Sequence, residues 1–497
     1  MESTKIKNGL KISTKEIPDL NINEFISFLK KSVDESKRCI LLFGKKEGES
    51  VRVYAVMSDD NNSLMYIVST LFEKQRMKYE SLTNYHPSFN LFERELFEEW
   101  GIVPEGHPFL KPVRYPHCKF DNKAKTYDYP FYTISSDEIH QVAVGPVHAG
   151  VIEPGHFRFL CEGEKIIHLE IQLGYQHRGV ENLFLKGNIT DKMELAESIT
   201  GDTVIGNAYA YSSIIEGTLD IKPTEDELLE RAIALEMERI AVHIGDIGAI
   251  ANDVAYMIGS AVSGANRTYV INTMLAICGS RFGRGFIGIG KNNYRITEKK
   301  RNLIKKNLHI VRENMEQLCE EMFDSPSVLS RLENTGAVTA KQARECGFVG
   351  MAARASGVKI DSRSDHPFGA YRKYPIHPLS LDTGDVFARA YLRYLEMQQS
   401  MNYINELLMV LGDSPSVSVP EKMEIPSNTF LISLIEGWRG EVVHAVVTDE
   451  KNRARYKIKD PSFNNWFALA LSVRGNGISD FPLCNKSFNL SYCGNDL

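Results

Sequence analysis

The sequence lacks any C-x-x-C pair, the spacing from which zinc sites and many iron–sulfur clusters are built. Its eight cysteines are scattered, and the two nearest, Cys484 and Cys493, are nine positions apart. Thiols scattered in this way are mostly small buried apolar side chains. The chain by itself therefore predicts no zinc site, and no iron–sulfur cluster of its own.

An excess of positive charge and long apolar runs are missing too. The formal net charge is -6, which argues against nucleic-acid binding. No stretch approaches the roughly 18 uninterrupted apolar residues of a membrane-spanning helix. The polar start, Met1-Glu-Ser-Thr-Lys5, lacks the apolar core of a signal peptide. We therefore expect a cytoplasmic protein that binds no nucleic acid.

A glycine-rich segment, residues 279–290, lacks the features of a phosphate-binding loop. It has neither the dinucleotide-binding spacing after a strand nor the Lys-Ser/Thr pair of a Walker motif. We expect no nucleotide there.

The first part of the chain is typical of a small α+β domain. Residues 22–33 carry apolar side chains at helical spacing. Three β-rich runs follow at 38–43, 50–57 and 63–69, separated by polar turns. We expect this domain to span residues 1–125, with a polar linker at 126–138.

A short amphipathic helix is expected near the end of this domain. Its apolar stripe is formed by Phe92, Leu96, Phe97 and Trp100, and Gly101 ends it. The acidic residues between them are expected to face solvent, as on an ordinary packing helix.

The larger region, residues 139–497, is mostly helical in pattern. A hairpin-like pair of apolar segments opens it, at 157–161 and 165–173. Long amphipathic runs follow at 227–242, 297–323 and 387–411. The predicted fold is therefore α+β, a small α+β domain followed by a bundle of long helices with minor β-structure.

Two polar pairs at i, i+3 spacing stand out in this region. The first is Thr200 and Thr203, ahead of an apolar run at 208–215, and the second is Ser462 and Asn465. Most such pairs are helix caps or turns. On composition alone, neither pair predicts chemistry.

The amphipathic helix and the loop after it resemble the signature of the 30 kDa-type subunit of respiratory complex I. In that family an E-R-E helix leads into a G-I…E-G-H-P loop. The matching residues are Glu93-Arg94-Glu95, Gly101-Ile102 and Glu105-Gly106-His107-Pro108. The resemblance implies a docking domain without a cofactor.

The large region resembles the shared family of the complex I 49 kDa subunit and the [NiFe]-hydrogenase large subunit. The fused order of the two domains is most similar to the formate hydrogenlyase and hydrogenase-4 branch. Five blocks carry the likeness: Gly145-Pro-Val-His148 with Glu153-Pro-Gly-His-Phe157; His177-Arg-Gly-Val-Glu181; Glu236-x-x-Arg239-x-x-x-His243; Gly357-Val-Lys-Ile-Asp-Ser-Arg363; and Glu436-Gly-Trp-Arg-Gly-Glu441 through to Asp460-Pro461.

The resemblance gives the two polar pairs a meaning. Active [NiFe]-hydrogenases hold their metals with two C-x-x-C pairs, because this chemistry needs soft, bridging thiolates. Matching the motifs puts Thr200 and Thr203 at the first pair, and Ser462 and Asn465 at the second. All four thiolate positions are thus replaced by hard, weak ligands. We expect no metal, no Ni–Fe centre and no hydrogen turnover.

Two residues of the family's site are retained, and a third belongs to a quinone site. Glu153 matches the proton-transfer glutamate, and Arg439 matches the arginine over the metals. They either form a buried ion pair with a structural role or take part in proton transfer and substrate positioning. His148 matches a quinone-binding histidine of complex I. Tyr209 and Tyr211 lie several residues downstream of the tyrosine expected with it.

These likenesses imply a subunit of a membrane-bound complex I-like or hydrogenase-4-like oxidoreductase, without a Ni–Fe centre. It would take part in electron transfer to a quinone or another acceptor and in proton coupling. The alternative is a non-catalytic scaffold that couples a redox module to ion-pumping membrane subunits. In either case a small subunit with a [4Fe–4S] cluster and membrane subunits are the expected partners. They would hold the chain peripherally on the inner face of the cell membrane.

Overall fold

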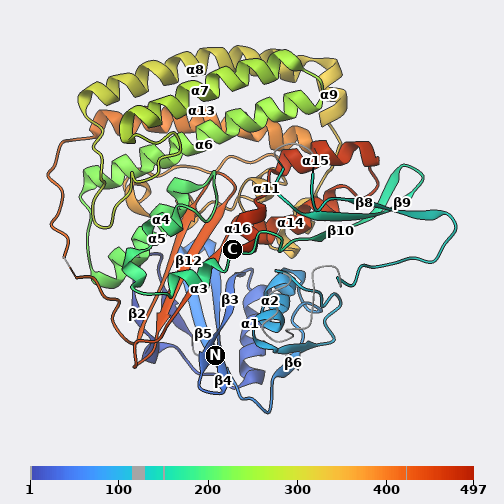
Figure 1. Cartoon of the computed structure of the whole chain (residues 1–497), viewed down its shortest axis with the longest axis vertical. Coiled ribbons are helices and arrows are strands. Elements are labelled where there is room, and N and C mark those ends of the chain that lie inside the picture. The colour runs from blue at the N-terminus through green and yellow to red at the C-terminus, as the bar shows by residue number, and fades with distance from the viewer. Residues whose placement is uncertain (1–2, 115–128, 149–151, 421) are drawn as a thin grey trace.

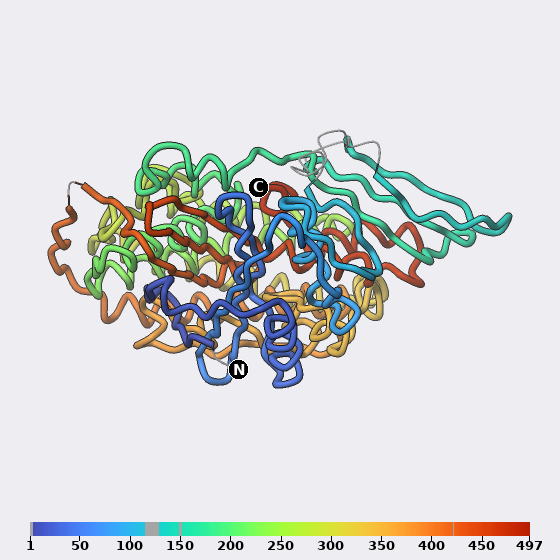
Figure 2. Tube along the Cα trace, turned by 90° about the horizontal axis from the view of Figure 1, so that it is seen from below, coloured from blue at the N-terminus to red at the C-terminus, as the bar shows by residue number. Residues whose placement is uncertain are grey.

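The computed structural model describes residues 3–114, 129–148, 152–420 and 422–497, so part of the predicted linker lies outside the described residues. The protein has a mixed α+β fold, which confirms the predicted class. A bundle of long helices lies on one side and an N-terminal α+β region on the other (Figure 1). Strands from distant parts of the chain lie between them, and a three-stranded arm projects sideways (Figures 1 and 2).

The N-terminal region contains the predicted helix and strands. The helix begins with a capping box in which Asn21 and Glu24 each accept a hydrogen bond from the other's backbone N–H. The sheet is antiparallel in the order β1-β5-β4-β3. Its elements, with the amphipathic helix that follows, are α1 (Ile22–Asp34), β1 (Thr4–Ile6), β3 (Arg38–Glu47), β4 (Ser50–Asp59), β5 (Leu64–Phe72) and α2 (Asn90–Trp100).

A second sheet joins the two ends of the chain. Its order is β13-β12-β11-β2, so a strand from the N-terminus pairs with one from beyond residue 428. Tyr54 of β4 stacks on Phe430 of β11, with ring centroids 6.5 Å apart, inside one shared hydrophobic cluster. This core lies across the predicted domain boundary. The strands are β2 (Ile12–Ser13), β11 (Thr429–Glu436), β12 (Glu441–Thr448) and β13 (Ala454–Lys459).

Three of the four acidic residues of α2 are buried (Glu93, Glu95 and Glu98), so the expectation that these residues face solvent is wrong. The Glu93 carboxylate accepts hydrogen bonds from the N–H groups of Leu82 and Thr83 at 2.7 and 3.0 Å. Glu95 pairs with Lys457 of β13 at 2.6 Å, although the two residues are 362 positions apart. A local pattern contains no information about such a distant partner.

Four long helices form the bundle. The three predicted amphipathic runs lie in three of them, whereas the fourth, α7, was not predicted. Its sequence contains one charged residue, Arg267, and its glycines and serines weaken the helical pattern. The helices are α6 (Glu225–Asp253), α7 (Met257–Cys278), α8 (Glu298–Asp324) and α13 (Val386–Val410).

The projecting arm is a three-stranded antiparallel sheet in the order β10-β9-β8 (Figure 2). It contains the predicted hairpin, and the loop between β8 and β9 carries His148 and Glu153. The strands are β8 (Ile139–Val144), β9 (His156–Glu162) and β10 (Lys165–Gln172). Within the described residues, no helix has the length and apolar character needed to cross a bilayer.

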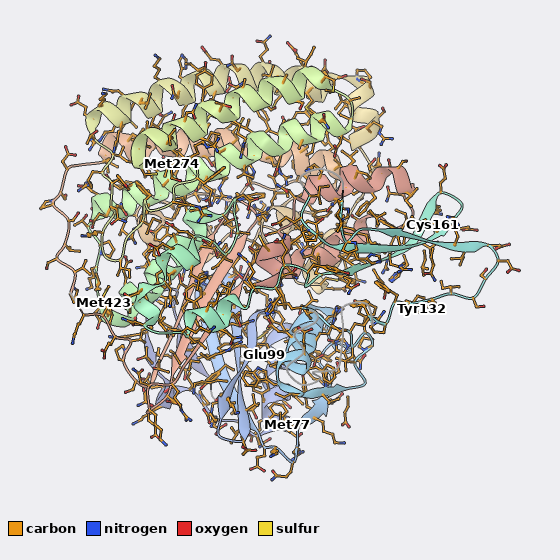
Figure 3. All side chains as sticks on the ribbon, in the orientation of Figure 1. Met77, Glu99, Tyr132, Cys161, Met274 and Met423 are labelled. Carbon is orange, nitrogen blue, oxygen red and sulfur yellow. The ribbon has the colours of Figure 1, made fainter. Side chains whose placement is uncertain are left out.

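The C-terminal segment returns to the middle of the molecule, where side chains fill the space between the bundle and the strands (Figures 1 and 3). Its last residue is buried. The Asp496 carboxylate accepts hydrogen bonds from the N–H groups of Gly174 and Gln176 at 2.8 and 2.9 Å. The helices there are α14 (Pro461–Ser472), α15 (Phe481–Phe488) and α16 (Tyr492–Asp496).

Candidate functional site

The first polar pair lies at the start of the buried helix α5 (Val204–Leu219). The Asn207 side-chain N–H₂ donates to the Thr200 hydroxyl and to the Thr203 carbonyl oxygen, both at 2.8 Å. The Asn207 carbonyl oxygen lies 3.2 Å from Nε2 of His444. All four side chains are buried. Asn207 therefore links Thr200, Thr203 and His444 through hydrogen bonds within the protein.

The start of α5 is capped from a neighbouring helix. Thr203 is the N-cap residue but makes no capping hydrogen bond with its side chain. The Glu238 carboxylate of α6 accepts instead from the N–H groups of Ile205 and Gly206, at 2.8 and 3.3 Å. Glu238 thereby replaces the usual local cap and fixes the turn that carries Thr203.

Arg439 lies over this turn, at the tip of the β11–β12 hairpin. Its two terminal nitrogens are each 2.7 Å from an oxygen of Asp202, and its Nε donates to the carbonyl oxygen of Asn489 at 2.5 Å. The guanidinium also stacks on Trp438, 3.9 Å from the ring centroid. Although burial opposes the charge, Asp202 raises the pKa of Arg439.

The tip of this hairpin passes very close to another backbone segment. Gly440 has φ +141°, and a Cβ there would lie 2.8 Å from the Cα of Gly350. Only glycine therefore fits at position 440, directly after Arg439 in the sequence.

Glu153 and Arg439 line one cavity, of about 180 Å³. Glu153 does not pair with Arg439, however. Its carboxylate accepts from the backbone N–H groups of Tyr492 and Cys493, at 3.3 and 3.5 Å. The structural alternative of a Glu153–Arg439 ion pair is therefore wrong, because the Arg439 guanidinium forms its ion pair with Asp202. The lining residues are Ile152, Glu153, Asp202, Arg439, Asn485, Lys486, Asn489, Leu490 and Tyr492.

The second polar pair does not line this cavity. Asn465 of α14 bonds through both side-chain atoms to the backbone of Val349, at 3.0 Å each. The Ser462 hydroxyl accepts from the N–H of Ser491 at 2.8 Å. The part of the C-terminal segment that does line the cavity lies between residues 485 and 492.

The donor atoms therefore do not fit a Ni–Fe centre. Thr200, Asn465 and Ser462 use their polar atoms in hydrogen bonds, and hydroxyl and amide oxygens are poor substitutes for thiolates. Within the described parts of the chain, no group of three or more His, Cys, Asp or Glu side chains could hold a metal ion.

The structure does not assemble the predicted quinone pocket. His148 Nε2 lies 2.9 Å from the carbonyl oxygen of Gly155, within its own loop. The Tyr211 hydroxyl donates to the Ile189 carbonyl oxygen at 2.8 Å. The ring of Tyr209 packs edge-on against Phe368, 5.5 Å between centroids. Neither tyrosine, nor His148, lines the cavity beside Glu153.

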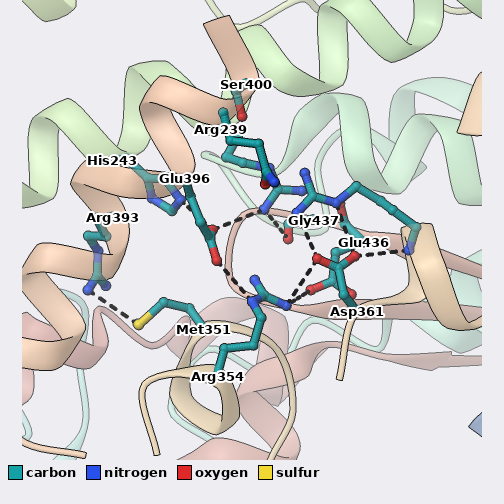
Figure 4. Close-up of polar contacts among 12 residues, drawn as sticks. Arg239, His243, Met351, Arg354, Asp361, Arg393, Glu396, Ser400, Glu436 and Gly437 are labelled. Atoms are coloured by element: carbon teal, nitrogen blue, oxygen red, sulfur yellow. Dashed lines mark hydrogen bonds and ion pairs between the residues drawn. The ribbon is translucent and has the colours of Figure 1, made fainter. Parts of the chain in front are cut away.

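Three of the sequence blocks meet in a buried ionic network (Figure 4). Arg239 donates to the carbonyl oxygens of Glu436 and Gly437, at 2.8 and 3.2 Å. Arg354 joins Glu396 to Glu436, at 2.9 and 2.7 Å. Because Arg239 holds the backbone at the end of β11, this network fixes the hairpin that presents Arg439.

The network extends along α6 and to the block at residues 357–363. His243 lies 2.9 Å from Glu396, and Arg363 pairs with Glu236 at 2.9 Å and with Asp361 at 2.7 Å. Burial opposes ionisation of Glu236, but Arg363 and Arg239 lower its pKa to about 2. Ion pairs between buried charged side chains thus hold the blocks together.

Two residues of the site were missed from the sequence. Asp202 stands between the paired threonines, and Glu238 lies within the E-x-x-R-x-x-x-H block. Both positions are inside stretches that the motifs had marked. Their roles depend on contacts with Arg439 and with the start of α5, which spacing does not reveal.

Two family models match the chain. That of the 30 kDa subunit of the respiratory-chain NADH dehydrogenase matches residues 16–130. That of the 49 kDa subunit matches residues 253–431 and 415–496.

Several characterised proteins are similar in sequence. Membrane-bound hydrogenase subunit alpha of Pyrococcus furiosus is 29% identical over 70% of this chain and 85% of that protein. Hydrogenase-4 component G of Escherichia coli is 25% identical over 92% of this chain and 83% of its own length. For formate hydrogenlyase subunit 5 of the same organism the identity is 26%, over 92% and 84%.

A chain of the membrane-bound sulfane sulfur reductase, an archaeal respiratory membrane complex, has the same fold. It superposes with a TM-score of 0.68 at 21% identity, over 74% of this chain and all of the other.

Proposed function

The chain belongs to the family of fused 30 kDa- and 49 kDa-type subunits of respiratory complex I-like enzymes, and from this premise we propose that it is the acceptor-site subunit of a membrane-bound oxidoreductase. The observation that carries the proposal is the cavity in which Glu153 and the Asp202–Arg439 pair face one space.

Each of these groups has a chemical task in reduction of a small acceptor. Arg439 is held in place by Asp202 and by the Asn489 carbonyl oxygen, so it offers a fixed positive charge to an acceptor that gains electrons. Glu153 is partly buried at the same cavity and can deliver a proton. The acceptor is a quinone headgroup or another small redox molecule. A cavity of about 180 Å³ has room for a single ring.

The electrons come from a partner in this proposal. A small subunit with a [4Fe–4S] cluster would pack against the cavity side, and membrane subunits would hold the complex on the inner face of the cell membrane. C-x-x-C pairs are absent from the sequence of this chain, and for this reason the proposal places the cluster in the partner.

The test is purification of the native complex through a tag on this chain. We expect an iron–sulfur subunit and membrane subunits to copurify. Acceptor reduction by this complex should fall strongly with Glu153→Gln. The matched control is Glu162→Gln, at an exposed position of the β9–β10 turn.

A scaffold without catalysis is the second candidate. It is favoured by the hydrogen bonds that Glu153 accepts from the C-terminal backbone, which alone could hold the loop before β9. If acceptor reduction survives both Glu153→Gln and Arg439→Met while the complex stays assembled, the scaffold is the correct function.

A further inference from the structure

A pocket of about 460 Å³, the α2–α14 pocket, lies where α2 meets β10 and α14 (Figure 1). These elements belong to the two predicted domains, so the pocket lies across their boundary. Apolar side chains make up most of its lining. Its described lining residues include none of those around Glu153 and Arg439, so it is a separate site. A volume of this size holds a small organic molecule.

The α2–α14 pocket has aromatic walls from both domains. Phe92 of α2 and Phe463 of α14 lie with their ring centroids 5.3 Å apart, so the two sides of the pocket are in contact. Walls of this kind favour a flat ring, which can stack or pack edge-on against them. The aromatic lining residues are Phe92, Phe109, Tyr129, Phe463, Trp466 and Phe467.

Arg94 of α2 adds a buried positive charge to this lining. Its side chain is 8% exposed, and its Nε and Nη2 donate to the carbonyl oxygens of Lys111 and Pro112, both at 2.7 Å. Among the described residues no carboxylate forms an ion pair with it. The nearby acid Glu95 pairs with Lys457 instead, at 2.6 Å. A buried charge without a counter-ion is costly, so a bound anion would stabilise Arg94.

The second positive charge of the pocket is Arg474, which follows α14 and is exposed, so it lies at the rim. Its Nη2 is 3.3 Å from Nδ1 of His168, and no described carboxylate forms an ion pair with it. Burial, and then Arg474, lower the pKa of His168, so this imidazole is neutral. Among the described lining residues the one acid is Glu170, which pairs with Lys111. The lining is therefore positively charged.

We propose that the α2–α14 pocket binds a small aromatic carboxylate. The ring lies between the aromatic walls, and the carboxylate pairs with Arg94, the buried cation that has no acidic partner. Arg474 at the rim attracts the anion as it enters. A neutral ring of the same shape fills the same space but leaves Arg94 without a counter-ion. The proposal does not depend on the proposed function, because the pocket and the cavity beside Glu153 share no described lining residue.

Four variants separate charge, space and folding. Arg94→Met removes the buried charge, whereas Arg94→Lys keeps it. Arg474→Met removes the exposed charge at the rim, and so tests the charge of the pocket even if Arg94→Met does not fold. Leu471→Trp fills the pocket from a partly buried lining position without changing its charge. The matched control is Arg76→Met, at an exposed position outside the pocket.

The test is calorimetric titration of the full-length chain with 2-naphthoate and with its neutral analogue 2-naphthamide. We expect 2-naphthoate to bind, and 2-naphthamide to bind about 10-fold or more weakly, because it lacks the charge-assisted contact. Arg94→Met should reduce the affinity for 2-naphthoate to that for the amide, and Arg474→Met should also weaken it. Arg94→Lys and Arg76→Met should retain the preference for the acid. Leu471→Trp should abolish binding of both compounds.

The absence of 2-naphthoate binding overturns the proposal. Equal affinities for the acid and the amide, or unchanged binding in Leu471→Trp, also overturn it. The purified complex should bind 2-naphthoate as the isolated chain does. Loss of binding in the complex would show that a partner subunit covers this surface, and would overturn the proposal as well. Failure of the complex to reduce any acceptor contradicts the proposed function instead, and does not affect these titrations.

Discussion

Arg439 and Asp202 face each other in a two-point ion pair, each guanidinium nitrogen 2.7 Å from one carboxylate oxygen. The pair ties the tip of the β11–β12 hairpin to the turn before α5. A carboxylate therefore holds the arginine above a turn in which two of the four metal-ligand positions, Thr200 and Thr203, carry no thiolate. The side chain of Asp202 is 39% exposed, whereas that of Arg439 is 5% exposed. The arginine is the fixed member of the pair.

Replacement of this arginine tests its role directly. Arg439→Met should lower acceptor reduction by about 100-fold or more, because a preorganised cationic donor is lost at the reacting centre. Asp202 stays partly solvated, so thermal unfolding of the isolated chain should change little. Arg439→Lys keeps the charge without the planar fork, and should retain an intermediate rate. Equal rates for Met and Lys would show that charge at this position has no part in the reaction.

Metal analysis tests the prediction that the four positions at which the thiolates are replaced bind no nickel. The purified complex should contain iron but no stoichiometric nickel, since Thr200, Ser462 and Asn465 engage their polar atoms in hydrogen bonds. A Thr200→Cys/Thr203→Cys double variant should also lack nickel, because two thiolates do not make a four-thiolate site. Stoichiometric nickel in the unaltered complex contradicts the prediction.

The buried pair Arg38–Glu441 should dominate the stability of the contact between the N-terminal sheet and the C-terminal sheet. Its atoms are 2.6 Å apart, and the Glu441 side chain is fully buried. Arg38→Met should lower the free energy of unfolding by an amount near the lower end of about 3–5 kcal/mol, because Lys459 still contacts Glu441 at 3.1 Å.

The matched control for this change is Arg52→Met in the neighbouring strand. Arg52 pairs with Asp19 and Glu47, whose side chains are 54% and 29% exposed. Arg52→Met should lower the free energy of unfolding by about 0–1 kcal/mol. Denaturant unfolding of the isolated chain measures both variants, and equal losses would refute a special role for the buried pair.

The same pair predicts a dependence of stability on acid. Burial opposes ionisation of Glu441, but Arg38 and Lys459 lower its pKa to about 2. Because the pKa in the folded chain is below the ordinary value of 4.5, the stabilisation is complete above that value and is lost as the pH falls toward about 2. Unfolding midpoints measured between these values should fall steadily. The slope should be smaller in Glu441→Gln, and an identical slope would contradict the assignment.

Local patterns in the sequence determined much of the fold. The predicted helix at 22–33 and the β-rich runs after it form α1, β3, β4 and β5, because a period of 3.6 or 2 reflects which face an element buries. The helix α7 was not predicted, since its exposed face carries almost no charge to contrast with its buried face. The motif blocks were recognised in order, and the family models bear out the family that they indicated.

Only the tertiary structure decided which side chains meet. In the structure Arg439 pairs with Asp202, and Glu153 accepts hydrogen bonds from the C-terminal backbone. Glu95 is buried against Lys457, and neither Tyr209 nor Tyr211 lines the cavity. These contacts join residues tens to hundreds of positions apart, and they are set by packing and by the need to pair every buried charge. Periodicity and motif spacing describe neighbours along the chain, so they contain no record of such partners.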